Sequence, residues 1–262
     1  MKTIVSQQIE ENRTLSVHTE HELLLKLEKA GLNSRLAQRI IDSKDNELGK
    51  KLVKFIENGG YGSSVSQNSA REIMGRNFFG IEEAVKYFGY PSKRQLSVLS
   101  QIPFTEETLV ACKATHVLIA VFPMSIVSIY KHVGRRSDPV LFFSDNGFIK
   151  KEFANDRGVV GWQLVSKLPT PDSASNTWND QLVLLSDTDE ATTARIVLYT
   201  MVGYFLNTRE PLFCKGCVRC NDLESTDCRV YVGYDDHGGI LIGHWFEESK
   251  SECLSLLSVK KR

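Results

Sequence analysis

The chain has 262 residues, of which 42% are hydrophobic, so it can bury a sizeable core in one large domain or two modest ones. Lysine plus arginine equals aspartate plus glutamate at 32 each, which argues against binding to nucleic acid or anionic lipid through net charge. The N-terminus does not resemble a secretory signal, and no apolar stretch is long enough to span a bilayer. We therefore expect a cytoplasmic protein that uses no cofactor and binds neither nucleic acid nor a membrane.

The N-terminal third is predicted to form three short amphipathic helices. Thr19 and Glu22 form a capping box ahead of a leucine-rich stretch that Gly31 ends. A second helix is predicted over residues 34–41 and a third over 45–56, where apolar residues recur at helical spacing. Each helix has an apolar stripe that needs a partner, so these helices are expected to mediate oligomerisation or docking.

A change in composition divides the chain after the third helix. We predict a helical module over residues 1–58, a linker rich in glycine and serine over 59–75, and a second domain over 76–262. In the second domain, helices are predicted at 81–88, 105–111, 177–185 and 193–206, and strands at 117–122 and 159–165. Helices and strands mix without regular βαβ alternation, which favours the α+β class.

The tail over residues 229–262 combines a regular apolar skeleton with irregular polar and aromatic side chains. The skeleton has the period of β-strands and consists of Val230, Val232, Ile240, Ile242, Leu254, Leu256 and Val259. Exposed aromatic groups among small polar ones are typical of binding surfaces, although an inward-pointing strand residue is an almost equally good interpretation of Trp245. The predicted ligand-binding residues are Tyr231, Tyr234, His237, Gly243, His244, Trp245, Glu247, Ser249, Ser251 and Cys253.

Four cysteines close together in the sequence raise the alternative of a structural zinc site. Cys214, Cys217, Cys220 and Cys228 include two-residue spacings that can wrap around a tetrahedral zinc ion. Three of them crowd into one run instead of forming two separated pairs, and Cys217 and Cys220 would lie on opposite faces of a strand. We therefore favour small apolar residues over metal ligands at these positions.

The sequence contains no motif of a catalytic nucleophile, a zinc protease or a nucleotide-binding loop. His116 lies beside an apolar strand and is predicted to be a core or edge residue rather than a general base. His237 and His244 lie near Asp235 and Asp236, which would allow a metal or acid–base pair, but exposed loop residues are the favoured interpretation. We therefore expect a protein that is not an enzyme.

The tail also follows a recognisable order of short motifs. It opens with RVYVG at 229–233, continues with Asp235-Asp236 and GILI at 239–242, and then has an aromatic pair at 245–246, Lys250 and the ending 254–261. This order resembles the C-terminal variable repeat of target proteins of diversity-generating retroelements, whose variable region lies on a C-type-lectin fold. Upstream segments at 161–165, 177–178 and 218–222 also resemble parts of such proteins.

The resemblance implies a C-type-lectin-like domain in a bacterial or phage protein that binds a protein or another macromolecular surface. In that family, unfaithful copying of adenines in a template RNA diversifies the tail, and most of the predicted ligand-binding residues belong to the set that such copying produces. Glu247, Glu248 and Glu252 depart from that set, which also fits a diverged or unmutated relative. Two alternatives remain: a zinc-stabilised interaction or regulatory protein, and an enzyme of the formylglycine-generating type on the same fold, for which Cys253 is the residue of interest.

Overall fold

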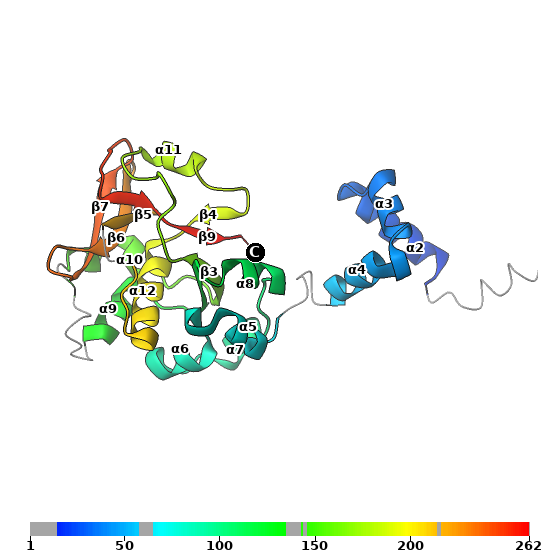
Figure 1. Ribbon diagram of the computed structural model, residues 1–262, viewed down its shortest axis with the longest axis horizontal. Helices are drawn as coiled ribbons and strands as arrows, with labels where there is room; N and C mark the ends of the chain where they lie inside the picture. The colour runs from blue at the N-terminus through cyan, green and yellow to red at the C-terminus, as the bar shows by residue number, and fades with distance from the viewer. Residues whose placement is uncertain (1–14, 58–64, 135–142, 144–145, 214–215, 262) are drawn as a thin grey trace, which may run out of the picture. The chain divides into compact units, whose positions relative to one another are not determined.

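The computed structural model describes residues 15–57, 65–134, 143, 146–213 and 216–261. The chain divides into two compact units, Met1–Tyr61 and Gly62–Arg262 (Figure 1). Helices are combined with two sheets that each contain parallel and antiparallel pairs, which confirms the α+β class. Within the described residues, no helix has both the length and the apolar character needed to cross a bilayer.

The first unit contains the three predicted helices, α2 (Val17–Lys29), α3 (Ser34–Ile41) and α4 (Glu47–Glu57), with a 3-10 turn η1 (Lys44–Asn46) before α4. The predicted capping box at Thr19 and Glu22 is wrong. The side chain of Ser16 accepts a hydrogen bond from the amide of Thr19 at 3.1 Å, so α2 begins earlier. Neither α2 nor α3 has a buried residue, and their leucines therefore stay largely exposed within this unit.

The second unit contains several short helices in its first half. They are α5 (Gln67–Met74), the 3-10 turn η2 (Gly75–Asn77), α6 (Ile81–Phe88), α7 (Lys93–Leu99), α8 (Glu106–Cys112) and α9 (Ile126–Gly134). Helix α5 corrects the predicted linker over 59–75, because Ala70 and Met74 are buried in the core of this unit. Residues 58–64 of that linker lie outside the described residues. The periodicity of a short helix next to a glycine- and serine-rich run was too weak to identify.

A five-stranded sheet forms one part of the core. Its strand order is β1 (Phe78–Phe79), β2 (His116–Val121), β3 (Gly161–Ser166), β9 (Ser258–Lys260) and β4 (Asp189–Ala191). β1 is parallel to β2, and the other neighbours are antiparallel. The indole of Trp162 on β3 is buried and donates to the carbonyl of Leu99 at 3.0 Å, which ties α7 to the sheet.

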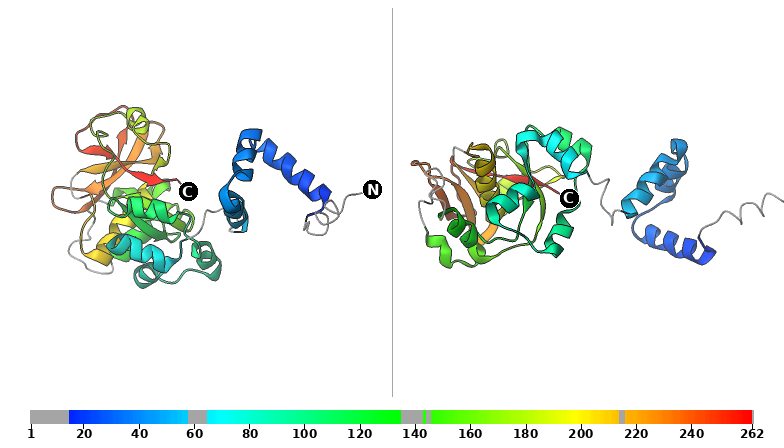
Figure 2. Two further views of the ribbon diagram at one scale, coloured as in Figure 1. Left: turned by 45° about the vertical axis from the view of Figure 1, so that its right-hand side comes forward. Right: turned by 90° about the horizontal axis from the view of Figure 1, so that it is seen from below.

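Helix α12 (Ala194–Thr208) connects the two sheets. It contacts β1 and β2 of the five-stranded sheet as well as β5 and β6 of the second sheet, and Figures 1 and 2 show it (yellow) between the two groups of strands. All its residues from Ala194 to Leu206 are buried, as is typical of a helix that is apolar around most of its circumference. The hydroxyl of Tyr199 donates to the carbonyl of Ala120 at 3.2 Å and fixes the helix on β2.

The second sheet has four strands in the order β7 (Ile240–Phe246), β6 (Cys228–Tyr234), β5 (Cys217–Ser225) and β8 (Leu254–Leu256). β5, β6 and β7 are antiparallel neighbours, and β8 is parallel to β5. All seven residues of the predicted apolar skeleton are buried, as expected. Three further elements precede the sheet in sequence, namely η3 (Gly147–Lys150), α10 (Glu152–Asn155) and α11 (Trp178–Val183).

Candidate functional site

Strands β6 and β7 carry a partly exposed aromatic pair. The rings of Tyr231 and Trp245 lie 6.2 Å apart between centroids, with their planes at 51°. Tyr231 alternates along β6 with Val230 and Val232, which are buried, so its side chain leaves the opposite face of the sheet. Trp245 is 38% exposed, which shows that its ring points away from the core.

Gly243 provides the space in which the ring of Tyr231 lies. The two residues are cross-strand partners in the antiparallel pair β6–β7. A Cβ atom at Gly243 would lie 2.5 Å from the hydroxyl oxygen of Tyr231 and 2.6 Å from its Cζ atom, so the ring covers the glycine. Gly243 was predicted as a ligand-binding residue. The structure shows instead that it lies under the ring of Tyr231, so any side chain at this position must displace that ring.

A hollow of about 300 Å³ adjoins the aromatic pair, and we call it the aromatic hollow. It brings together Tyr231, Tyr234, Trp245 and Cys253, four of the residues that the sequence predicted. Its remaining lining residues are Gly216, Cys217, Asp235, Asp236, Leu241 and Leu254. The residues that line the hollow therefore include three aromatic residues, two aspartates and two cysteines.

The two cysteines meet where β5 approaches the segment before β8. The amide of Cys217 donates to the carbonyl of Cys253 at 2.7 Å, and a Cβ atom at Gly216 would lie 2.7 Å from the same carbonyl. Burial raises the pKa of the Cys217 thiol to about 11, and the neighbouring Cys253 adds to the increase. Cys217 is thus a protonated thiol at neutral pH, whereas Cys253 is exposed.

The loop after β7 is held through its main chain. The carbonyl oxygens of Glu247, Ser249 and Ser251 each accept a hydrogen bond from a residue outside the tail. The donors are the amide of Trp178 at 2.8 Å, the guanidinium of Arg219 at 2.9 Å and the amide of Ser175 at 2.9 Å, in that order. Because they use backbone oxygens, these three contacts do not depend on the identity of the loop's own side chains.

Arg219 is the central contact of this arrangement. Its side chain is fully buried, and its guanidinium also donates to Gln181 Oε1 at 3.2 Å and to the carbonyl of Phe246 at 3.4 Å. Burial lowers its pKa, and Glu247 opposes that change. One buried cation thus joins β5, α11 and the end of β7 through neutral oxygens.

The side chain of Glu247, predicted to bind a ligand, is engaged within the protein. Its Oε1 atom forms an ion pair with Arg229 Nε at 2.6 Å. The guanidinium of Arg229 lies 4.7 Å from the centroid of the Trp178 ring and donates to the carbonyl of Asn221 at 2.6 Å. Trp178 is buried, so this stack anchors α11 against β6.

The two histidines of the tail lie outside the aromatic hollow. His244 lines a second hollow of about 290 Å³ on the other side of Tyr231, together with Phe148 and Phe153. Lys151 and Glu224 also line it and form an ion pair with each other. His237 is exposed in the turn between β6 and β7, where its amide donates to Asp235 Oδ1 at 2.9 Å. The predicted site residues are therefore distributed over more than one surface.

No family model, curated protein or solved structure matches the chain. The function must therefore be inferred from the geometry of the described residues.

The described cysteines do not gather around a common point. Cys220 and Cys228 are buried, whereas Cys217 lines the aromatic hollow. Burial raises the pKa of the Cys220 thiol well above its ordinary value. Among the described residues, no group of three or more histidine, cysteine, aspartate or glutamate side chains is placed to hold a metal ion. Cys214 lies outside the described residues.

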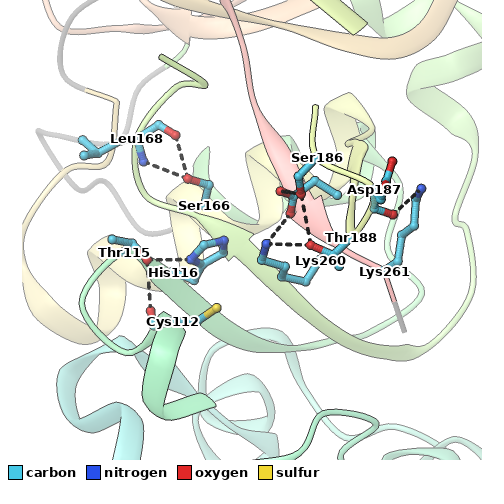
Figure 3. A network of polar contacts seen from close by, with 11 residues as sticks. Cys112, Thr115, His116, Ser166, Leu168, Ser186, Asp187, Thr188, Lys260 and Lys261 are labelled. Atoms are coloured by element: carbon cyan, nitrogen blue, oxygen red, sulfur yellow. Dashed lines mark hydrogen bonds and ion pairs between the residues drawn. The ribbon is translucent and has the colours of Figure 1, made fainter. Parts of the chain in front are cut away.

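A separate polar cluster occupies one end of the five-stranded sheet (Figure 3). Burial lowers the pKa of His116 and raises that of Cys112, and the charges of Lys260 and Asp189 act on both. A neutral imidazole and a protonated thiol are the reverse of a thiolate–imidazolium pair. The Lys260–Asp189 ion pair, at 2.9 Å, fastens β9 to β4. This cluster is best explained as structural, in line with the prediction for His116.

Sequence reasoning missed the residues that shape the site from outside the tail. The sequence does not indicate that Arg219 is buried, because a single arginine between two cysteines has no pattern that distinguishes a buried position from an exposed one. Leu241 lies within the tail and was also missed. Because it alternates along β7 with the buried Ile240 and Ile242, its side chain leaves the opposite face of the strand, and it lines the aromatic hollow. The sequence marked Asp235 and Asp236 as a step in the motif order of the tail and as a possible metal or acid–base pair, whereas the structure places both at the aromatic hollow.

Proposed function

We propose that the protein is a non-enzymatic ligand-binding protein whose binding surface is centred on the aromatic hollow. The observation that carries this proposal is the partly exposed pair Tyr231–Trp245, which borders a hollow and lies on strands whose alternate residues are buried. Aromatic side chains on a rigid backbone supply a large contact area at low entropic cost. The ligand proposed is a protein or another macromolecule.

A finer proposal concerns how this surface arises. We propose that the second unit is a C-type-lectin-like domain and that its tail is diversified, as the resemblance of residues 229–261 implies. Support comes from the loop at 247–251, which is held by carbonyl oxygens and by Arg219, so Ser249 and Ser251 can be exchanged without loss of these contacts. Gly243 and Glu247 are exceptions, because Tyr231 covers the first and Arg229 pairs with the second.

Two experiments test these proposals separately. For binding, a displayed protein library is selected on the immobilised full chain, and the selected binders are measured against Trp245→Ala and Phe246→Ala. Both residues are exposed, but they alternate along β7, so Phe246→Ala is a matched control. Binders that lose affinity only for Trp245→Ala support the surface, whereas equal affinity for both variants contradicts it.

For diversification, the gene and its flanking DNA are sequenced across one population of cells. The proposal requires substitutions at Tyr231, Tyr234, Ser249, Ser251 and other predicted tail positions, next to a near-copy of the repeat and a reverse-transcriptase gene. The buried skeleton residues serve as the internal control and should not vary. A uniform tail without a nearby repeat removes the retroelement proposal but leaves the binding surface untouched.

The two alternatives have less support. The cysteines that the structure describes do not assemble a zinc site, and stoichiometric zinc in purified protein would be needed to revive that hypothesis. For an enzyme, Cys253 is exposed, and its side-chain contact is the hydroxyl of Ser251 at 3.0 Å. Among the described lining residues of the aromatic hollow there is no histidine, the base that most often activates a cysteine thiol.

A further inference from the structure

We infer that the protein binds an extended segment of its protein ligand as an added β-strand, which pairs with the outer edge of β7. This inference rests on the proposed function and adds the mode of binding. Strand β7 is an edge of the four-stranded sheet, because it ends the strand order β7–β6–β5–β8 (Figure 1). An edge strand presents unpaired main-chain N–H and C=O groups, to which a second chain can add by hydrogen bonding.

Strand β7 differs from the other edge strands in length and composition. The edges of the two sheets are β7, β8, β1 and β4, and the last three contain two or three residues, whereas β7 has seven. Its sequence, ILIGHWF, contains no acidic residue, lysine, arginine or proline, and it pairs with β6 over seven consecutive residues without a bulge. Proteins commonly protect an edge with short strands, charges, prolines or bulges. Among the described edge strands, β7 is therefore the one suited to pairing with another chain.

The hydrogen bonds of the β6–β7 hairpin show which main-chain groups face outward. The amide of Glu247 donates to the carbonyl of Asp227 at 2.8 Å, and the amide of Asp235 donates to the carbonyl of Gly239 at 2.9 Å. Bonded and non-bonded pairs alternate along an antiparallel ladder. The odd-numbered residues of β7 therefore bond to β6, and the even-numbered ones direct their main-chain groups to the outer edge.

Ile242 and His244 are the residues at which a ligand strand would add. In the part of the chain that the structure describes, their outward main-chain groups form no hydrogen bond with another segment. At Ile240 the edge already forms a parallel bridge with Phe143, so an extended residue fits beside this strand. The second hollow, of about 290 Å³, adjoins Ile242, Gly243 and His244 and leaves space next to them.

Hollows on both faces of β7 would recognise alternate side chains of the added strand. On one face, Leu241 and Trp245 line the aromatic hollow. On the other face, Ile242 and His244 line the second hollow together with Phe148. Successive side chains of an added strand point to opposite faces in the same way. Main-chain bonds would therefore supply affinity, and apolar or aromatic side chains beside Trp245 and Phe148 would supply specificity.

The test follows the exchange of the β7 amides by NMR in the full chain. Without ligand, the amides of Ile242 and His244 should exchange rapidly, whereas those of Leu241, Gly243 and Trp245 should be protected by β6. A displayed library of linear peptides is then selected on the immobilised full chain, and the tightest-binding peptide is the probe. It should slow exchange at Ile242 and His244 by at least about tenfold and leave the three control amides unchanged.

Two further changes isolate the main-chain bonds. N-methylation removes one peptide donor at a time and should weaken binding at every second position, because alternate donors face β7. In the protein, His244→Pro and His244→Ala both remove the imidazole, but only proline removes the outward amide, at an edge position where it is tolerated. We expect His244→Pro to weaken the probe about five- to tenfold more than His244→Ala, with urea unfolding as the check that both variants fold.

Several results would overturn the inference. They are a selection that yields no peptide, a probe that leaves exchange at Ile242 and His244 unchanged, and equal effects of N-methylation at all positions. Protection of these two amides in a dimer without peptide would assign the edge to a second copy of the chain and would also overturn it. The proposed binding surface is judged separately, by the comparison of Trp245→Ala with Phe246→Ala.

Discussion

The buried Arg219 offers the sharpest test of how the site is held. We consider Arg219→Met, which keeps a long side chain of similar reach but removes every hydrogen-bond donor. The guanidinium lies 2.9 Å from the carbonyl of Ser249, 3.2 Å from Gln181 Oε1 and 3.4 Å from the carbonyl of Phe246. All three acceptors would lose this donor, and the contact with Gln181 is buried while those with Ser249 and Phe246 are part-buried.

The expected cost follows from the balance of two contributions. The two shorter contacts are lost, and each buried acceptor left without a donor costs about 1–3 kcal/mol. Removing a buried charge offsets part of this cost, since its desolvation penalty disappears. We therefore expect Arg219→Met to lower the free energy of unfolding by about 2–3 kcal/mol. For a unit of this size, that corresponds to a decrease in Tm of roughly 4–12 °C.

The assay is urea unfolding of the full chain, combined with hydrogen exchange. Arg76→Met is the matched control, because Arg76 makes an exposed ion pair with Glu210 at 2.6 Å, and we expect its midpoint to be unchanged. In Arg219→Met, exchange should accelerate over residues 173–184 and 247–253 while the amides of α12 stay protected. Equal midpoints for the two variants, or acceleration spread evenly over both sheets, would refute the reasoning.

Three further perturbations test the core and the ionisable groups. In a Cys214→Ser background at mildly alkaline pH, a thiol reagent should modify Cys253 well before Cys217, whose pKa is about 11, and comparable rates would contradict the assigned burial. Burial raises the pKa of the Asp222 carboxyl, so the folded protein binds this proton more tightly than the unfolded chain does. The contribution of Asp222 to the free energy of unfolding therefore falls as the pH rises above about 4. The stability of Asp222→Asn relative to the original protein should therefore increase with pH over that window in urea titrations, and a constant difference would exclude this account. Trp162→Phe should cost about 2 kcal/mol in the same assay, because a buried ring is shortened and a buried carbonyl loses its donor.

Local patterns were sufficient for much of the secondary structure. Helices α3 and α6 match their predicted bounds, and Thr105 and Thr177 cap α8 and α11 where the sequence suggested. Helix α5 was missed because it follows a glycine- and serine-rich run that was interpreted as a linker, and α7 was missed because it lies in a stretch with a proline and three serines at 91–100. Strands β1 and β4 have two and three residues and exist through pairing with β2 and β9.

The candidate site was predictable only where it follows from the alternation of strands. Val230 and Val232 predict a buried face, so Tyr231 had to lie on the other one. Whether an outward residue joins a hollow depends on contacts between distant segments, such as that of Cys217 with Cys253 or of Arg219 with the loop after β7. Such contacts have no local signature.

These contacts divide the tail into two kinds of position. At Ser249 and Ser251 the fold uses the carbonyl oxygen, so a change of side chain leaves the hydrogen bond from Arg219 or Ser175 in place. At Gly243 the fold uses the absence of a side chain, because the ring of Tyr231 occupies that space. Variation of the first kind changes the surface without moving the backbone, whereas variation at Gly243 rearranges the aromatic pair itself. A tail that changes its ligand while it keeps its fold therefore depends on buried groups outside the tail, and Arg219 is the clearest of them.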